Sequence, residues 1–193
     1  MDIKFSGFGG QGIIKSGMII GKAASLYDNL HATLTQSFGP EARGSACSAA
    51  LVVDESPVLY PYIVTPHILV SMSQEAYEKF SDELAPGGTL LIDADLVQME
   101  APRNDVSIFS TPATRIAEEM GNRLFSNVVM MGFFTAITKV VRPESVKKAL
   151  SGLIPERFME KNIEAFDRGY DYGLEVLEQA DDGIAAETDA REK

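Results

Sequence analysis

Cysteine and histidine are scarce in this chain, and their scarcity limits the metal chemistry that it can perform. Among 193 residues there is one cysteine, Cys47, and there are two histidines, His31 and His67. One cysteine excludes a disulfide within the chain. It also excludes an iron–sulfur cluster or a thiolate zinc site, because these need about four ligands. The histidines lack metal-ligand spacing, and no base is placed to activate Cys47 as a nucleophile. We therefore predict no metal site and no catalytic residue here.

Long hydrophobic runs are also missing. The best candidate, Val128–Thr138, falls short of the roughly 20 apolar residues that a membrane helix needs. The N-terminus opens on Asp2 and lacks the basic, apolar and small-residue order of a signal peptide. The expectation is a cytoplasmic protein that does not bind membranes.

Basic residues are outnumbered by acidic ones. The chain has 17 Lys and Arg against 28 Asp and Glu, a net charge of -11 at pH 7. This balance disfavours nucleic-acid binding, which needs a basic face. Part of the excess lies in residues 178–193, which hold six acids and two bases and little that could be buried. We predict a single domain over residues 1–179 and an acidic, disordered tail over residues 180–193.

Strand and helix patterns alternate through the first two-thirds of the chain. This order predicts a three-layer α/β/α fold with a mostly parallel or mixed, Rossmann-like sheet and a helical C-terminal third. The predicted strands are residues 2–8, 32–37, 48–54, 68–71, 89–93 and 105–110. The predicted helices are residues 13–27, 74–84, 112–121 and 127–139, followed by one that begins at Pro143 and one that begins at Pro155 and ends near Gln179. Ser73 and Thr111 are predicted as helix N-caps.

A glycine-rich turn joins the first predicted strand to the first predicted helix. Residues 7–12 read GFGGQG and match G-x-G-x-x-G in the strand–turn–helix context that this motif requires. Glycine lets main-chain N–H groups approach a phosphate closely, and the helix N-terminus adds a partial positive charge. Gly9, Gly10, Gln11 and Gly12 are therefore candidates for binding an anionic group such as a pyrophosphate.

Two other interpretations of this turn stay open at this point. A free-standing NAD(P)- or nucleotide-binding Rossmann protein would need an acid at the end of the second strand to hold the ribose. That strand ends in Gln36-Ser37, and the nearest acid, Glu41, follows in a loop. In a purely structural scaffold subunit, the glycines would serve only a tight turn and close helix packing.

A second loop, residues 39–44 (GPEARG), follows the second predicted strand. Loops that leave the carboxyl ends of strands line the ligand crevice of an open α/β sheet, so this loop is expected beside the glycine turn. The planar guanidinium of Arg43 suits a phosphate, a carboxylate or an acid on a partner. The alternative is an internal Glu41–Arg43 pair on a solvated turn, which would contribute little.

The two loops together resemble the gamma subunits of 2-oxoacid:ferredoxin oxidoreductases. The resemblance rests on GFGGQGI, on TQSFGPEARGSACSAALVVD, and further on SMSQEAYEKF, APGGTLLIDADLV and NVVMMGFFTAI. It covers roughly residues 3–179, and its GPEAR form is most similar to the 2-oxoglutarate type. The family usually has a second glycine where this chain has Ser45, which narrows the backbone freedom of the loop.

The resemblance implies a division of labour among subunits. Such enzymes decarboxylate a 2-oxoacid oxidatively to an acyl-CoA, and this chain would support assembly and would not catalyse alone. Thiamine diphosphate, Mg and iron–sulfur clusters are expected on the partners, which are alpha, beta and ferredoxin-like delta subunits. Coenzyme A is the expected ligand of the glycine turn, with Arg43 as a charged partner and Asn127 as a hydrogen-bonding one.

Asn127 and the last predicted helix each have a second interpretation. Asn127 stands at the start of its predicted helix, so it serves equally well as an N-cap. The last helix carries an apolar stripe, which predicts an interface with a partner or a homodimer of the isolated chain. The stripe consists of Phe158, Ile163, Phe166, Tyr170 and Leu174.

Overall fold

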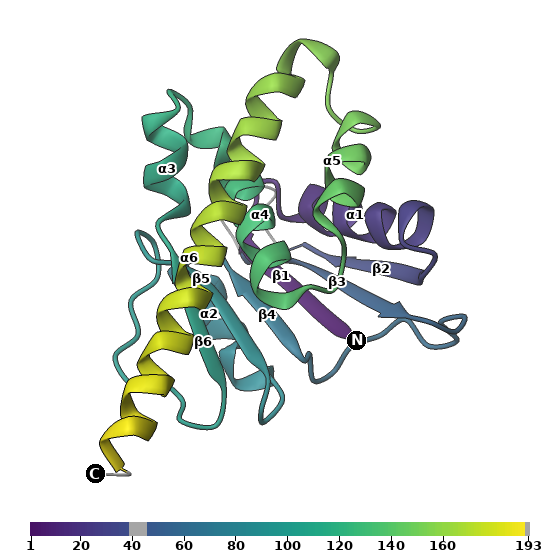
Figure 1. Ribbon diagram of the computed structural model, residues 1–193. Helices are drawn as coiled ribbons and strands as arrows, with labels where there is room; N and C mark the ends of the chain where they lie inside the picture. The colour runs from purple at the N-terminus through teal and green to yellow at the C-terminus, as the bar shows by residue number, and fades with distance from the viewer. Residues whose placement is uncertain (39–45, 192–193) are drawn as a thin grey trace.

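A six-stranded sheet forms the centre of the molecule (Figure 1). The computed structural model describes residues 1–38 and 46–191, with the side chains of these residues as far as Ala180. The strands are β1 (Asp2–Phe8), β2 (His31–Ser37), β3 (Ala46–Asp54), β4 (Ile68–Ser71), β5 (Thr89–Asp93) and β6 (Ser107–Thr111). The helices are α1 (Ile13–Lys22), α2 (Gln74–Phe80), α3 (Ala113–Glu119), α4 (Ser126–Thr138), α5 (Pro143–Ser151) and α6 (Met159–Arg191).

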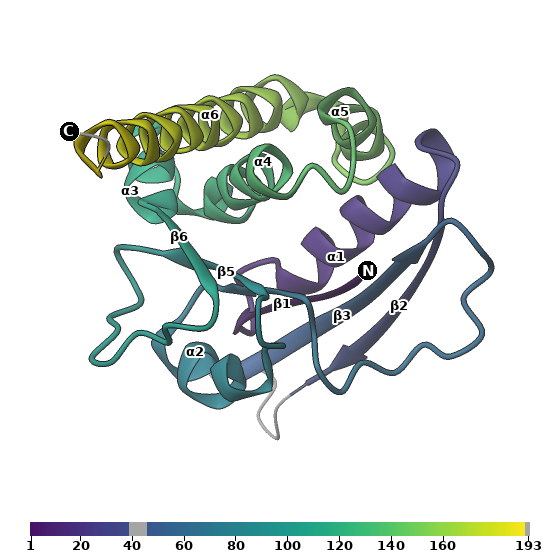
Figure 2. The same ribbon diagram turned by 60° about the horizontal axis from the view of Figure 1, so that its bottom comes forward.

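The sheet is mixed because one strand, β3, runs antiparallel to the others. Its order is β2-β3-β1-β4-β5-β6, in which β3 runs antiparallel to both of its neighbours while β1, β4, β5 and β6 are mutually parallel. Helices cover both faces, with α2 on one side and α1, α4, α5 and α6 on the other (Figure 2). The predicted α/β class, with its mostly parallel sheet and helical last third, is confirmed.

Strand β3 places the strand ends that flank the two predicted loops at one edge of the sheet. Phe8, at the end of β1, pairs with Ala46, at the start of β3, and Ser37, at the end of β2, pairs with Ser48. The chain between β2 and β3 is therefore connected as a hairpin at the edge where the glycine turn follows β1. Arg43 itself lies outside the described residues.

Helices α4 and α6 pack through glycines. A Cβ on Gly132 would overlap the Phe166 carbonyl oxygen, and one on Gly169 would overlap the Val129 carbonyl oxygen. This close approach buries α4 almost entirely and places Phe166 inside the core at 0% exposure. The predicted interface stripe on the last helix is therefore wrong for Phe166, because α4 of the same chain covers it.

Helix α6 is longer than its apolar pattern suggests. The sequence predicts an end near Gln179, whereas the helix continues to Arg191. Residues 180–191 include four Ala, the residue type with the highest helix propensity, which favours a helix without an apolar face. The division into a domain over residues 1–179 and a disordered tail stays a prediction.

A buried carboxylate caps α3. The sequence predicts Thr111 as the N-cap, but this is wrong, since Thr111 Oγ1 has no hydrogen-bond partner and Pro112 occupies the cap position. Asp93 takes over the function from the end of β5. Its Oδ2 accepts from the Thr114 N–H at 3.1 Å and from the Thr114 hydroxyl at 2.6 Å.

The unfolding free energy should depend on pH through the Asp93 carboxyl group. Burial raises the pKa of Asp93, which is 0% exposed, while hydrogen bonds from Thr114 oppose the shift. A carboxyl with a raised folded-state pKa stabilises the fold fully below the pKa of the unfolded chain, and this contribution is lost as pH rises through the folded pKa. The unfolding free energy of the wild type minus that of Asp93→Asn should fall as pH rises from about 4 through the raised pKa. Denaturant titrations across that window measure the difference, and a pH-independent one would contradict the expectation.

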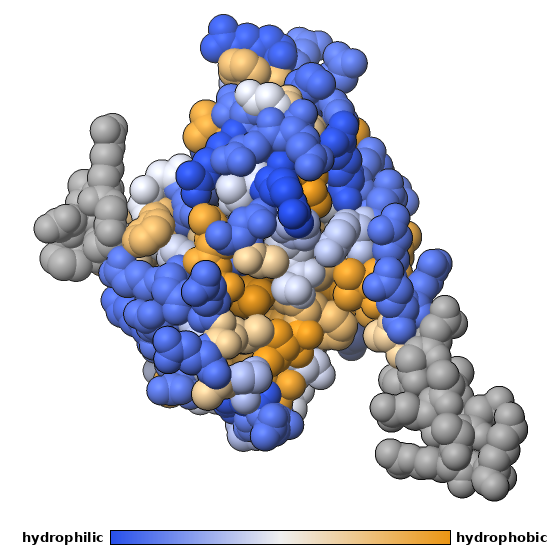
Figure 3. All heavy atoms as spheres, turned by 90° about the vertical axis from the view of Figure 1, so that its left-hand side faces the viewer, coloured by the Kyte–Doolittle hydropathy of each residue, from blue (hydrophilic) through white to orange (hydrophobic). Residues whose placement is uncertain are grey.

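The side of the molecule where α3 and α6 lie is mostly hydrophilic, with an apolar area in its middle (Figure 3). The outermost strand on this side, β6, carries the half-buried Ile108 and Phe109. In the described part of the chain, no helix combines the length and hydrophobicity that crossing a bilayer requires.

Candidate functional site

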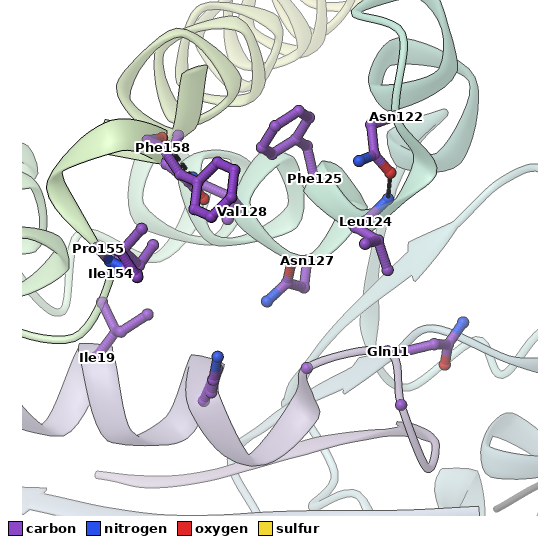
Figure 4. A pocket seen from close by; sticks show the side chains of 14 residues that line it. Gln11, Ile19, Asn122, Leu124, Phe125, Asn127, Val128, Ile154, Pro155 and Phe158 are labelled. Carbon is purple, nitrogen blue, oxygen red and sulfur yellow. Dashed lines mark hydrogen bonds between the residues drawn. The ribbon is translucent and has the colours of Figure 1, made fainter. Parts of the chain in front are cut away.

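A cavity of about 460 Å³ opens beside the glycine turn (Figure 4). Three parts of the chain form it, namely the turn with the first half of α1, the start of α4, and the connection from α5 to α6. The lining residues are Gly10, Gln11, Gly12, Lys15, Ile19, Asn122, Leu124, Phe125, Asn127, Val128, Ile154, Pro155, Phe158 and Asn162.

The turn has a conformation that depends on glycine and on one side chain. Gly10 has φ 103° and Gly12 has φ 81°, values that residues with a Cβ rarely adopt. The Gln11 side chain holds the turn from inside. The Phe8 N–H donates to its Oε1 at 2.6 Å, and its Nε2 donates to the Met72 carbonyl at 2.8 Å. Both ends of the Gln11 amide therefore support the turn.

Several main-chain amides of the turn remain available. The Gln11 N–H donates to the Phe8 carbonyl, and the first bond of α1 runs from Ser16 N–H to the Gly12 carbonyl at 2.9 Å. Within the described ranges, the N–H groups of Gly9, Gly10, Gly12 and the first turn of α1 have no acceptor. The scaffold alternative is favoured by a turn whose N–H groups are all bonded internally, and this turn instead leaves donors free to bind water or an anion.

Asn127 faces this turn from α4. It is the second residue of α4, whose cap position is Phe125, so the N-cap interpretation is wrong. A Cβ on Gly12 would overlap the Asn127 Nδ2 and would lie 2.9 Å from its Cγ. The side chain extends into the space between α4 and α1 (Figure 4). It is 8% exposed, and among the described residues it makes no hydrogen bond.

Two helix N-termini thus meet at the cavity, those of α1 and α4, and each adds a partial positive charge. Lys15, one turn into α1, supplies a full positive charge. Sequence reasoning missed Lys15, although its position three residues after Gly12 was a usable signal. The far wall is apolar and includes Ile19, Val128 and Phe158 (Figure 4). The arrangement suits a ligand that is anionic at one end and apolar along its length.

The cysteine and histidines lie outside this cavity. Cys47 is buried in β3 opposite Gly7, and burial raises the pKa of its thiol, which keeps it protonated. His67 Nδ1 accepts from the Asp2 N–H at 3.1 Å. Within residues 1–38 and 46–180, no group of three or more His, Cys, Asp or Glu side chains is placed to hold a metal ion.

The strand order disfavours the NAD alternative. A dinucleotide fold places the ribose-binding acid at the end of a parallel strand next to β1. Here the parallel neighbour of β1 is β4, which ends at Ser71 and is followed by Met72 and Ser73, so no acid stands there. The other neighbour, β3, runs the opposite way and ends at Asp54, at the far edge of the sheet. Strand β2 ends at the correct edge but is separated from β1 by β3.

Comparison with known proteins defines the class of this α/β chain. Residues 2–172 match the family described as pyruvate ferredoxin/flavodoxin oxidoreductase, and the chain belongs to that family. It is 45% identical over 177 residues to 2-oxoglutarate synthase subunit KorC of Methanocaldococcus jannaschii, across 91% of this chain and 95% of the relative. Within the family, the resemblance to gamma subunits is thereby confirmed, and the chain is a subunit of an oxidoreductase complex.

Solved structures agree with this assignment. The keto/oxoacid ferredoxin oxidoreductase gamma subunit of Geobacter sulfurreducens superposes with a TM-score of 0.80 at 36% identity, across 90% of this chain and 98% of that one. The 2-oxoglutarate:ferredoxin oxidoreductase of Magnetococcus marinus, determined with 2-oxoglutarate, coenzyme A and succinyl-CoA bound, superposes with a TM-score of 0.81 at 25% identity. This match covers 90% of the present chain but 31% of the Magnetococcus chain.

Proposed function

We propose that this chain is the gamma subunit of a 2-oxoglutarate:ferredoxin oxidoreductase and that it contributes part of the coenzyme A site. The substrate preference is supported by identities of 42–45% to three archaeal 2-oxoglutarate synthase subunits. Thiamine diphosphate, Mg and the iron–sulfur clusters would lie on alpha, beta and delta partners. The relative from Magnetococcus, in which a similar domain forms about a third of one longer chain, supports a tightly integrated complex.

The observation that carries the coenzyme A proposal is the unpartnered Asn127 amide between two helix N-termini. Coenzyme A combines phosphates with a long pantetheine arm, whose gem-dimethyl and methylene groups alternate with two amides. The pyrophosphate would receive hydrogen bonds from the free amides of the Gly9–Gly12 turn and from Asn127, with Lys15 as counter-charge. The pantetheine arm would lie along the apolar wall formed by Ile19, Val128 and Phe158.

The Lys15→Gln variant tests this role in the assembled complex. Loss of one charge-assisted bond to phosphate costs about 1.5–3 kcal/mol, so the KM for coenzyme A should rise roughly tenfold or more. The KM for 2-oxoglutarate should stay unchanged, since that substrate reacts on the thiamine-bearing chains. Lys22→Gln removes the same charge two turns further along α1, outside the cavity, and serves as the control.

The predicted contribution of Arg43 is tested in the same assay. Arg43→Gln should also raise the KM for coenzyme A, and the effect should persist in the Lys15→Gln background if the two cations contact different phosphates. Unchanged coenzyme A dependence in both variants would reduce the role of this chain to assembly.

A further inference from the structure

The connection from β3 to β4 exposes apolar side chains to an unusual degree. Its central part, residues 57–65, reads PVLYPYIVT and carries no charged residue; we call it the tyrosine loop. Leu59 is 95% exposed, Val64 78%, Tyr60 69% and Tyr62 66%. Large apolar side chains this close together are seldom left in water on a protein that works alone.

The tyrosine loop does not contribute side chains to the hydrophobic core of the described residues. None of its residues belongs to, or packs against, either hydrophobic cluster of the described residues. Pro57 and Pro61 fix two φ angles, and the Tyr60 and Tyr62 rings meet edge to face with centroids 5.6 Å apart. The prolines and the paired rings therefore restrict the conformation of the loop, and its apolar side chains do not pack on the hydrophobic core of the same chain.

The ends of this connection lie at the edge of the sheet opposite the cavity. Asp54, the last residue of β3, pairs with His31, the first residue of β2, and the His67 N–H donates to the Asp2 carbonyl at 2.8 Å. Figure 1 shows the connection extending beyond the tip of β3, on the side where the N-terminus lies. A partner bound here would leave the glycine turn accessible.

We propose that the tyrosine loop is the surface by which this chain docks onto the subunit that corresponds to the remainder of the fused relatives. A domain of this fold forms 31% of the Magnetococcus chain and 37% of the ketoisovalerate oxidoreductase subunit VorA from Methanothermobacter thermautotrophicus. In those proteins a covalent link holds the domain to its neighbour. A separate chain needs an interface instead.

The composition of the loop identifies the chemistry of that partner surface. Cores of protein interfaces are rich in aromatic residues and poor in charge, as this loop is. The partner surface should be an apolar depression with hydrogen-bond acceptors for the two tyrosine hydroxyls. This inference rests on the proposed subunit role and is independent of coenzyme A binding.

The test is co-expression of the tagged chain with the other subunits of the complex. The variant Leu59→Ser/Tyr60→Ser/Val64→Ser should reduce association at least about tenfold, measured as subunit stoichiometry by size-exclusion chromatography with light scattering. The melting temperature of the isolated variant should match the wild type, because the loop lies outside the core. Leu59→Met/Val64→Ile keeps the apolar character and should assemble normally.

Leu26→Ser is the matched control, since it removes a leucine that is 64% exposed and lies outside both the tyrosine loop and the predicted stripe on α6. Normal assembly of the triple variant, or an equal loss of assembly in Leu26→Ser, would overturn the proposal. The KM measurement on Lys15→Gln is independent of both results, so the docking and coenzyme A proposals can fail separately.

Hydrogen exchange gives a readout that needs no substitution. Within the described residues, no amide of the tyrosine loop donates a hydrogen bond, so these amides should exchange fast in the isolated chain. In the complex their exchange should slow on the order of tenfold or more. Equal rates in both states would contradict docking at this loop.

Discussion

Gly169→Ala should strongly destabilise the fold. Its Cβ would overlap the Val129 carbonyl oxygen and would lie 2.7 Å from the Val129 carbonyl carbon. Both atoms are backbone atoms of α4, so the whole helix must move away. Such overpacking costs about 3 kcal/mol or more, which shifts the denaturation midpoint at unchanged slope in a urea titration.

Gly152→Ala is the control for Gly169→Ala. Gly152 follows α5 with φ -87°, and its added Cβ would meet nothing closer than 3.7 Å. Because its conformation suits alanine, this change should be neutral or stabilising by about 0.5 kcal/mol. If the two variants had similar stabilities, the close contact between α4 and α6 would be refuted.

Gly12→Ala should cost the complex most of its coenzyme A affinity. The left-handed backbone at φ 81° disfavours alanine by about 1–2 kcal/mol, and the new Cβ would push the Asn127 amide out of place. Both changes disturb the donors that the proposed site offers to phosphate. We expect the KM for coenzyme A to rise by about two orders of magnitude, with the complex still assembled.

A double-mutant cycle separates the two causes. The three nearest atoms to the new Cβ all belong to Asn127, and the Asn127 Cβ lies at an ordinary 3.5 Å. Asn127→Ala should therefore relieve the steric part of the Gly12→Ala defect and leave the backbone part. The loss of unfolding free energy in Gly12→Ala/Asn127→Ala should be about 1 kcal/mol smaller than the sum of the losses in the two single variants. Coenzyme A binding should stay weak in the double variant. Strict additivity would mean that the two residues do not touch.

Local sequence patterns predict the parts of this fold that local physics determines. The glycine turn after β1 follows from residues 7–12, because no other residue type tolerates its φ angles at low cost. Ser73 is confirmed as the N-cap of α2, since its Oγ accepts from the Ala76 N–H. The alternation of strands and helices likewise gives the α/β class.

Features that depend on distant contacts could not be predicted in the same way. The residues of β3 fit either strand direction, so only its pairing with β1 and β2 makes it antiparallel. The position of the Asn127 amide beside the glycine turn could not be predicted, because Gly12, which it faces, is 115 residues away along the chain. The close contact of Gly169 with α4 likewise depends on a helix that lies about 40 residues earlier in the chain.

The antiparallel direction of β3 determines how the chain between β2 and β3 can change in length during evolution. If β3 were parallel to β2, a crossover helix would have to join the two strands, and a change in the length of that connection would require the helix to repack. A hairpin instead returns directly to the ladder at Ser48, so insertions there leave every other element in place. Changes in the length of this connection can therefore accumulate while β1 and the glycine turn that follows it keep their place in the sheet.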